Sequence, residues 1–516
     1  MKELCDVVII GAGLGGLAAA AYLTKAGLRV LIFERNPHVG GTAYVYHRKG
    51  FTFPMGPLGF SHPLLVQRVL KELGVGEDLE FSRIHYRLRA FDLDMPLSLP
   101  FSDMVKTLGE LFPGDEEGVS RFFSDASDWI SKSKSDGKRF ESCRRDHLSA
   151  SGYLQERVKD RRLRRILGSL GTREPYSGLP LLRAMWNLMS REGIWFPREG
   201  MRSFCDRMAQ AVVKKEGAQS EIRLSKGVET IRVDHGKVLG VILEDQTVID
   251  APFVISNGDY KSTFLKLLDS RSVSSRWHRA VSQARQTGSI FQVCLGVDRH
   301  KVDLSAFKEA SRVIYRRGDK RGDRGIEERK NLDWEKSQID PEELGEQEIE
   351  VSLWGENWDE ILSGKSVSLV LRVEADFGHF SRFWQGWRRR SSEYTDYKVR
   401  LAQGLIREVG SWLPGLEKAI RVMDVATPLT VQDQGGRSGG AVAGWSWDYE
   451  DFQEDEPKDL ILTPIRGLYM AGYQAFSALF MGGVPTALES GKRAADAVLR
   501  GAEPTEEISI PGVSDA

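Results

Sequence analysis

The chain has 516 residues, more than one hydrophobic core usually serves, so its length predicts two domains. Charged residues make up 28% and hydrophobic residues 41%, as in an ordinary globular protein, and a formal net charge of -1 argues against a protein that coats nucleic acid. The four cysteines, Cys5, Cys143, Cys205 and Cys294, include no CxxC pair, which argues against a zinc or iron–sulfur site and favours a reducing, cytoplasmic compartment.

Residues 6–34 predict a strand, a glycine turn, a helix and a second strand. The run DVVII at 6–10 is β-branched, as in a strand buried on both faces, and the following GAGLGG satisfies GxGxxG. An Ala/Leu-rich helix is expected over 17–26, where Gly27 ends it, and RVLIF predicts a strand over 29–33. Because glycines interrupt the apolar run, we expect neither a signal peptide nor a membrane-spanning helix.

This pattern is typical of a dinucleotide-binding fold. Gly11 permits the tight turn, Gly13 lets the backbone approach a diphosphate, and Gly16 lets the helix pack closely on the strand. The helix N-terminus faces the negative charge. Glu34 follows the second strand, where its carboxylate can accept hydrogen bonds from ribose hydroxyls and disfavours the 2′-phosphate of NADP.

Further glycine turns are expected at the same site. A glycine pair at 40–41 brings more backbone N–H groups toward the diphosphate, with an ordinary surface loop as the alternative interpretation. Residues 468–471 predict a strand that stops at Gly472, and GGVP at 482–485 precedes a predicted helix over 486–499. The N-terminus of that helix is suited to another negative part of the same cofactor.

Short blocks along nearly the whole chain resemble those of a known family. ExxxxxGG from Glu34 is similar to an extended FAD signature, Ser256-Asn257-Gly258-Asp259 to an SNAD block, and residues 467–499 to a C-terminal flavin motif. Further similar blocks lie at 40–63, 193–218, 288–298 and 427–430. Together they resemble the phytoene desaturase, carotenoid isomerase and retinol saturase-like flavoproteins of the flavin amine oxidase superfamily. The resemblance implies FAD as the cofactor and a last strand and helix that complete the N-terminal domain.

Some positions depart from the pattern of that family. Thr42 stands where Arg usually follows the glycine pair, which removes a cation near the phosphates. Pro54 stands where Asp is common. Tyr473-Gln474 follow Gly472 in place of a small or acidic residue, so Gln474 is expected to meet the ribityl hydroxyls only as a neutral partner.

The fold class expected is α/β, a Rossmann-like FAD-binding domain interleaved with an α+β substrate-binding domain. The ranges assigned to the FAD-binding domain are 1–80, 193–260 and 456–502, and those assigned to the substrate-binding domain are 81–192 and 261–455. Residues 317–348 are interpreted as a charged, solvated loop and 503–516 as a flexible tail.

Within these domains the residue patterns predict several elements. Residues 81–192 are expected to be mostly helical, with helical spacing over 103–111 and 181–189. Residues 226–259 alternate as a small antiparallel sheet. Further strands and one amphipathic helix are expected at 289–295, 367–373 and 397–413.

The residues expected to bind FAD lie in the blocks above, and no catalytic residue or metal ligand is assigned. They are Gly11, Gly13, Leu14, Gly15, Gly16, Glu34, Arg35, Gly40, Gly41, Thr42, Gly56, Pro57, Val228, Gly472, Gly482, Gly483 and Val484. Aromatic residues in or beside these blocks suit an apolar tunnel against the flavin, although each one taken singly is better interpreted as a core residue: Tyr44, Tyr46, Phe51, Phe53, Phe60, Trp186, Trp195, Phe196, Trp445, Trp447, Tyr449 and Phe476.

The resemblance implies an FAD-dependent oxidoreductase acting on C–C and C=C bonds of a long hydrophobic polyene or isoprenoid, as a carotenoid desaturase or isomerase does. A retinol-saturase-like reductase, a flavin amine oxidase and a non-catalytic flavoprotein are the alternatives. Only one GxGxxG occurs, so a diffusing acceptor, quinone or oxygen, is expected to reoxidise the flavin.

Two basic clusters bear on partners. They are RVKDRRLRR at 157–165 and RRR at 388–390, which follows Trp384 and Trp387. One interpretation is a solvated surface, and the other is attraction to anionic lipid headgroups with the tryptophans at the interface. The second suits a water-insoluble substrate and a peripheral place on the cytoplasmic membrane face. No nucleic-acid recognition module accompanies either cluster.

Overall fold

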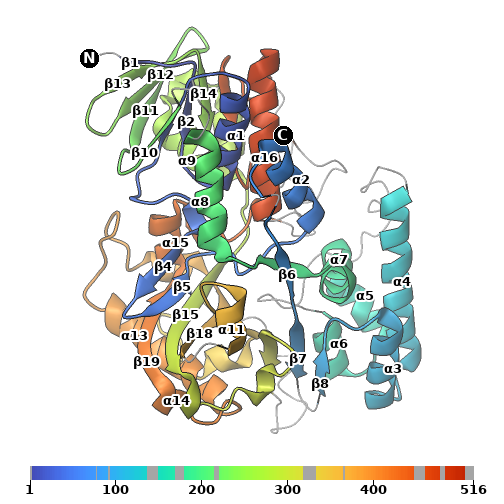
Figure 1. Ribbon diagram of the computed structural model, residues 1–516. Helices are drawn as coiled ribbons and strands as arrows, with labels where there is room; N and C mark the ends of the chain where they lie inside the picture. Colours follow the sequence, from blue (N-terminus) through green and yellow to red (C-terminus); the bar gives the residue numbers. More distant parts are fainter. Residues whose placement is uncertain are drawn as a thin grey trace.

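A computed structural model provides the structure of the chain (Figure 1). It describes residues 3–76, 78–90, 93–135, 149–168, 179–213, 220–317, 333–363, 366–446, 459–476 and 483–505. Cys143, Trp447, Tyr449 and Gly482 lie outside these ranges.

A five-stranded parallel sheet unites segments that are far apart in the sequence. Its order is β10-β3-β2-β14-β20. The strands are β2 (Val7–Ile10), β3 (Val30–Phe33), β10 (Glu221–Arg223), β14 (Phe253–Ser256) and β20 (Leu468–Met470). Every residue of β2 and β3 is buried, as expected for apolar runs in a sheet covered on both faces. The Rossmann-like sheet predicted from the N-terminal pattern is confirmed, and the C-terminal strand joins it.

Two helices from opposite ends of the chain pack side by side against this sheet (Figure 1). They are α1 (Leu14–Lys25) and α16 (Val484–Arg500). A Cβ at Gly491 would lie 2.2 Å from the Gly15 carbonyl oxygen, so only glycine permits this close approach. Helix α1 begins three residues before the predicted start because the turn glycine Gly13 is itself its N-cap.

A small sheet of order β1-β13-β12-β11 lies beside the first one. It contains β1 (Glu3–Leu4), β11 (Val228–Asp234), β12 (Lys237–Leu243) and β13 (Val248–Asp250). The antiparallel prediction for 226–259 is therefore correct for β11 to β13 and wrong for β14, which pairs in parallel with β2 and β20. The run FVIS is apolar without alternation, which suits a buried parallel strand.

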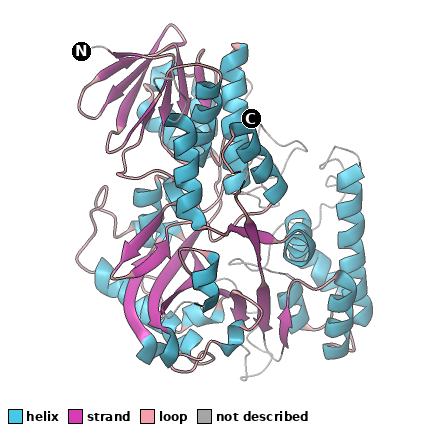
Figure 2. Cartoon of the chain, viewed as in Figure 1, coloured by secondary structure: helices cyan, strands magenta, loops and turns pink. Residues whose placement is uncertain are grey.

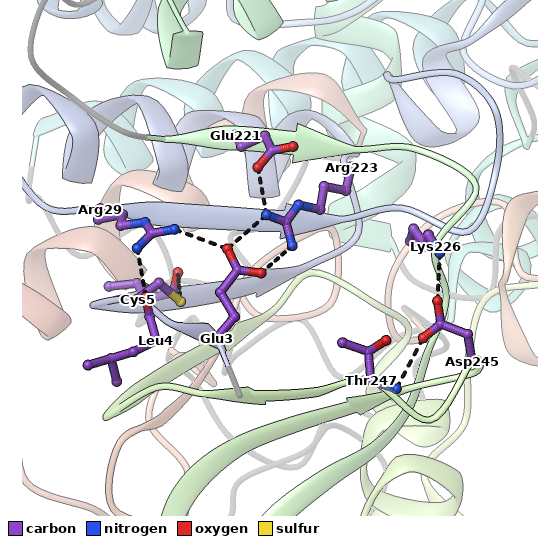
Figure 3. A network of polar contacts seen from close by, with 10 residues as sticks. Glu3, Leu4, Cys5, Arg29, Glu221, Arg223, Lys226, Asp245 and Thr247 are labelled. Atoms are coloured by element: carbon purple, nitrogen blue, oxygen red, sulfur yellow. Dashed lines mark hydrogen bonds and ion pairs between the residues drawn. The ribbon is translucent and has the colours of Figure 1, made fainter. Parts of the chain in front are cut away.

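An ionic network ties this small sheet to the edge of the five-stranded sheet (Figure 3). The Glu3 carboxylate accepts hydrogen bonds from Arg223 at 2.6 and 2.8 Å and from Arg29 at 3.0 Å. Arg223 also donates to Glu221 at 2.7 Å. The hydrogen bond from Arg223 is the main cause that holds the pKa of Glu3 below its ordinary value.

Replacing Glu3 with Gln is expected to lower the free energy of unfolding slightly, by about 1 kcal/mol or less, because the pair is partly solvated. The folded pKa of Glu3 is depressed, so its stabilisation is present above the unfolded pKa and is lost as pH falls through the folded value. The free energies of unfolding of the two proteins in urea should therefore differ at neutral pH and converge at an acid pH below the folded pKa of Glu3. An equal difference at both pH values would contradict this.

A second, seven-stranded sheet has the order β19-β15-β18-β17-β16-β7-β8 (Figure 2). Its strands are β7 (Tyr86–Ala90), β8 (Leu93–Pro96), β15 (Ser289–Asp298), β16 (Arg312–Arg316), β17 (Ile349–Trp354), β18 (Ser366–Ala375) and β19 (Ile420–Ala426). The predicted strands at 289–295 and 367–373 lie within β15 and β18. The prediction that 81–192 is mostly helical is wrong for its first part, because β7 and β8 belong to this sheet and β6 (Phe81–Ile84) pairs with β9 (Ile194–Pro197).

Five helices form a separate group around an aromatic core (Figure 1). They are α3 (Phe101–Leu111), α4 (Glu116–Ser135), α5 (Ala150–Arg157), α6 (Arg161–Leu167) and α7 (Leu179–Asn187), followed by a π-helical turn, Leu188–Glu192. Phe123 and Trp186 meet edge to face at 5.2 Å in this core. Trp186 is thus a packing residue of the helical group.

The remaining helices have these bounds: α2, Pro63–Leu73; α8, Gly200–Val213; α9, Tyr260–Ser262; α10, Ser275–Gln283; α11, Trp358–Ser363; α12, Phe377–Ser381; α13, Tyr394–Gly410; α14, Leu416–Ala419; and α15, Pro428–Gly435. A hairpin of β4 (Val45–Arg48) and β5 (Phe51–Pro54) completes the described elements. Helix α13 corresponds to the helix predicted at 397–413.

Part of the stretch 317–348 is buried, so its interpretation as a solvated loop is wrong there. Residues 318–332 lie outside the described ranges. Ile339 and Leu344 are core residues, and the Glu348 carboxylate accepts a hydrogen bond from buried Arg316 at 2.5 Å. Apolar side chains spaced among charges are enough to anchor the described part. The division into two domains remains a prediction.

Candidate functional site

The first glycine turn joins β2 to α1 by close backbone contacts. Gly11 has a φ of +93°, and its N–H donates to the Phe33 carbonyl at 2.8 Å. A Cβ at Gly16 would lie 2.2 Å from the Gly11 carbonyl oxygen. Leu14 begins the helix and is buried. The turn therefore presents backbone, without side chains, at the helix N-terminus.

The second glycine pair lies directly on the first turn. The Gly40 N–H donates to the Ala12 carbonyl at 2.8 Å, and Gly13 and Gly40 form a parallel bridge. A Cβ at Gly41 would lie 3.2 Å from the Gly13 Cα. Gly40 and Gly41 both have left-handed φ values, +97° and +57°. The structure thus brings 40–41 to the dinucleotide turn, and the surface-loop alternative does not describe it.

Asn257, at the end of β14, fills the space between these turns. Its Nδ2 donates to the Gly11 carbonyl at 3.3 Å. A Cβ would lie 2.8 Å from this Nδ2 if placed on Gly13, and 2.5 Å from the Asn257 Oδ1 if placed on Gly15. Asn257 was absent from the predicted site residues, although the Ser-Asn-Gly-Asp block that contains it was a recognisable signal.

The C-terminal motif meets the same edge of the sheet. Gly472 follows β20 with a φ of +98°, and its N–H donates to Ser490 Oγ at 2.8 Å. A Cβ at Gly15 would lie 2.8 Å from the Gly472 nitrogen and 3.0 Å from the Ala487 carbonyl oxygen. Gly483 is the N-cap of α16 and Val484 its first residue, one turn before Ala487. The N-termini of α1 and α16 therefore lie together.

Glu34 holds the other side of the first turn. It is 6% exposed, and its two carboxylate oxygens accept hydrogen bonds from the Ala12 N–H at 2.9 Å and the Asn36 N–H at 2.8 Å. Each oxygen keeps capacity for a further donor, as a ribose hydroxyl would supply. The Lys226 N–H donates to the Glu34 carbonyl at 2.8 Å, which brings the start of β11 at Val228 beside this acid.

Four predicted residues face the second sheet and its loops. Arg35 donates to the Asp433 carbonyl of α15 at 3.2 Å. Thr42 accepts a hydrogen bond from Arg437 at 2.8 Å. The Gly56 carbonyl accepts from buried Arg372 of β18, and Pro57 follows it, partly buried. These contacts connect the glycine turns to the second half of the chain.

Gln474 is 2% exposed, and its Oε1 accepts a hydrogen bond from the Tyr260 N–H at 2.7 Å. The amide therefore satisfies a donor at the start of α9. Its place beside the ribityl hydroxyls remains a prediction. A neutral amide suits this buried position, where a carboxylate would be desolvated.

Three of the aromatic residues predicted for a tunnel belong to separate packing clusters. Phe196 meets Trp354 at 5.2 Å, and Trp445 meets Tyr260 at 5.6 Å, while Trp186 lies in the helical group. The sequence blocks place aromatic side chains near the site but do not tell which way each one points.

The residues at this sheet edge fit FAD. Glycine turns that a Cβ would fill, two adjacent helix N-termini and one buried carboxylate provide a cradle for a diphosphate and a ribose. Within the described residues, no group of three or more His, Cys, Asp or Glu side chains could hold a metal ion. No helix among them is long and apolar enough to cross a membrane.

Known proteins resemble this chain in sequence and in fold. A family model described as "Flavin containing amine oxidoreductase" matches residues 14–373. Prolycopene isomerase of Arabidopsis thaliana is 27% identical over 303 residues, 52% of this chain and 50% of that protein. The lycopene-forming phytoene desaturase of Pseudescherichia vulneris is 27% identical over 323 residues, 58% of this chain and 64% of that protein. The chain thus spans about half to two thirds of these curated relatives, and they bear out the resemblance read from the sequence blocks.

Solved structures share the fold over nearly the whole length. An oxidoreductase from Methanosarcina mazei has a TM-score of 0.63 at 17% identity, covering 96% of this chain and 100% of that one. Putrescine oxidase bound to putrescine also has a TM-score of 0.63 at 17% identity, covering 97% of this chain and 100% of that one. At such identity the likeness establishes the fold alone.

Proposed function

Because this chain belongs to the flavin-containing amine oxidoreductase family and FAD is its cofactor, we propose that it is an oxidoreductase acting on C–C or C=C bonds of a long hydrophobic polyene or isoprenoid. The observation that carries the proposal is the meeting of Gly15, Gly472 and the first turn of α16 around Asn257. The curated relatives named for phytoene and prolycopene support the substrate class.

The glycine turns at 11–16 and 40–41, with Glu34, are proposed to hold the diphosphate and ribose of FAD. Gly56-Pro57, Gly472 and Gly483-Val484 are proposed to hold its remaining parts. When bound, FAD can accept a hydride from a C–H bond of the substrate. The task of the protein is then to orient the cofactor and exclude water from it.

The second sheet is suited to that task because it covers the segment after the second glycine pair. Tyr46 donates to Asp424 of β19 at 2.9 Å, and Ser368 of β18 donates to the Thr52 carbonyl at 2.8 Å. Gln292 of β15 donates to the Pro54 carbonyl at 3.1 Å. These bonds hold the β4–β5 hairpin against the second sheet. The apolar side chains beside the hairpin are then proposed to exclude water from the cofactor. A diffusing quinone or oxygen is proposed to reoxidise the flavin.

Expression in hosts that accumulate phytoene or prolycopene tests the function. We expect flavin-loaded protein and a new desaturated or isomerised pigment on chromatography. A flavin-free variant, Gly16→Ala, is the matched control and should leave the pigments unchanged. Unchanged pigments with a fully flavin-loaded protein would overturn the proposal.

A panel of amines separates the amine oxidase alternative. Bleaching of the flavin by amines under anaerobic conditions would replace the polyene proposal by an amine substrate. Bleaching by neither amines nor any hydrophobic extract would favour the non-catalytic flavoprotein.

We further propose that the segment 384–390 contacts a membrane surface. Trp384 and Trp387 are 47% and 56% exposed. Arg388 and Arg389 are exposed beside them, whereas Arg390 pairs with Asp433 at 2.8 Å and serves the packing. Exposed indoles next to exposed arginines suit an anionic headgroup layer. Arg388 also donates to Gln434 Oε1 at 3.0 Å and lies over the Trp387 ring at 4.4 Å. The cluster at 157–165 is less suited, because Arg162 pairs with Asp160 and Arg165 donates to the Glu346 carbonyl.

Replacing both Trp384 and Trp387 with Ala is expected to weaken sedimentation with anionic vesicles about tenfold, since buried indole area drives interfacial binding. Leu64→Ala removes a more exposed apolar side chain, 79% exposed, on α2 and is the control. Equal binding of the double variant and the original protein would refute docking through this segment.

A further inference from the structure

Thr42 stands where the family usually has Arg, and the guanidinium of Arg437 from another segment lies beside it. Thr42 follows Gly41, which contacts the first glycine turn. Arg437 lies nearly four hundred positions later, in the loop after α15, and its Nη2 donates to Thr42 Oγ1 at 2.8 Å. The tertiary structure thus places the Arg437 guanidinium beside Thr42, the position at which the family usually has Arg.

Several contacts fix this guanidinium. Its Nη1 donates to the Ala441 carbonyl at 3.3 Å and to the Val442 carbonyl. Its Cζ lies 4.1 Å from the centre of the Tyr473 ring, a cation–π contact. Tyr473 follows Gly472, so Arg437 is held between the 40–42 turn and the C-terminal flavin motif.

The nearby carboxylate does not neutralise Arg437. Among the residues that the structure describes, Arg437 forms no ion pair with a carboxylate. Asp259 instead accepts hydrogen bonds from Ser438 Oγ at 2.6 Å and from the Tyr473 hydroxyl at 3.1 Å. It therefore orients the two neighbours of the guanidinium. Burial lowers the pKa of Arg437, and the proximity of Tyr473 and Asp259 opposes that shift.

Arg437 is a partly buried cation that pairs with no carboxylate among the described residues, so an anion beside it would complete its environment. The anion proposed for this site is the diphosphate of FAD, and two glycines allow the Arg437 loop to come close to the 40–42 turn. A Cβ at Gly435 would lie 3.0 Å from Thr42 Cγ2, and one at Gly440 would lie 2.5 Å from the Pro428 carbonyl oxygen. Small residues thus let the loop carrying Arg437 approach the turn.

We propose that Arg437 is a cofactor-binding residue that supplies the positive charge missing at Thr42 and binds the diphosphate of FAD. Asp259 and Tyr473 act as positioning residues for it. Because Arg437 comes from the segment assigned to the substrate-binding domain, cofactor binding and the packing of that loop depend on each other.

The assignment rests on the FAD site of the proposed function, and its test reads cofactor binding alone. Holoenzyme of the original protein and of Arg437→Gln is diluted, and the fluorescence of released FAD gives the dissociation constant. Loss of a charge-assisted contact should weaken FAD at least about tenfold in Arg437→Gln. Arg437→Lys, which keeps the charge, should lose much less. Arg271→Gln is the control that should change nothing, because the Arg271 side chain is 89% exposed and pairs only with Asp269 among the bonds described.

Displacement by ADP identifies the part of FAD that Arg437 contacts. ADP shares the diphosphate and adenosine of FAD but lacks the flavin. If Arg437 binds the diphosphate, both ligands weaken equally in Arg437→Gln, so the ADP concentration that displaces half the FAD stays within about twofold. The assignment would be overturned if that ADP concentration shifted by the same factor as the FAD dissociation constant. It would also be overturned if the FAD affinity of Arg437→Gln were unchanged.

Thr42→Val keeps the test decisive if Arg437→Gln fails to fold. It preserves the volume of the side chain and removes the acceptor of the Arg437 hydrogen bond, so FAD should weaken about fivefold, the usual value of one such bond. Unchanged affinity would count against the assignment. A chain that binds FAD normally but alters no polyene would refute the proposed activity and leave this assignment standing.

Discussion

Replacing Gly16 with Ala is expected to yield a protein that purifies without FAD. The new Cβ would lie 2.2 Å from the Gly11 carbonyl oxygen and 3.2 Å from the Asn257 Cβ. A backbone oxygen cannot rotate away as a side chain does, so the turn has to open. The N–H groups proposed to bind the diphosphate then lose their arrangement, and FAD affinity should fall by at least about tenfold.

Flavin absorbance per mole of purified protein measures this loss. Gly27→Ala is the matched control at the other end of α1. Its φ of +95° costs a side chain about 1–2 kcal/mol, but no atom lies within 4 Å of the added Cβ. Gly27→Ala should thus lower stability and retain FAD. Full flavin content in Gly16→Ala would show that the close approach seen here is not required.

Replacing Glu348 with Ala should destabilise the protein by about 3–5 kcal/mol, the usual effect of leaving a buried charge without its partner. The side chains of Arg316 and Glu348 are 0% and 1% exposed and meet at 2.5 Å. Burial lowers the pKa of Arg316 to about 10, so at neutral pH the guanidinium stays charged and loses its carboxylate. The midpoint of thermal unfolding measures the effect.

Two comparisons separate burial from charge in that result. Glu343 pairs with Lys336 at 3.1 Å on the surface of the same segment, and Glu343→Ala should cost less than about 1 kcal/mol. The double change Arg316→Met with Glu348→Leu removes both charges and should cost less than Glu348→Ala alone. Equal losses for Glu343→Ala and Glu348→Ala would contradict the burial seen here.

Local patterns predicted the parts of the site that a short segment builds by itself. DVVII, the glycine turn and the helix after it are adjacent in the chain, and the structure has them as β2, Gly11–Gly16 and α1. The prediction failed where a strand depends on its partners. The apolar run of β14 suits a buried parallel strand, but neither β14 nor β7 tells which strands it pairs with, because pairing in a sheet depends on segments elsewhere in the chain.

The prediction that the charged stretch 317–348 is a solvated loop failed for a related reason. Composition measures how many charges a segment has, and it does not tell which charge meets a partner in the core. Glu348 is buried because Arg316 of β16 lies opposite it.

By itself, then, the sequence determined the glycine turns and the acid at Glu34, because those features depend on neighbours a few residues apart. That the two chain ends share one cofactor followed from the family resemblance of the blocks at each end. Only the tertiary structure decided that Asn257 fills the space between the turns and that Arg437 replaces the cation missing at Thr42. Hydrogen bonds and charge compensation act over a few ångströms in space, whatever the separation along the chain. Contacts between residues hundreds of positions apart are therefore decided by the folded structure.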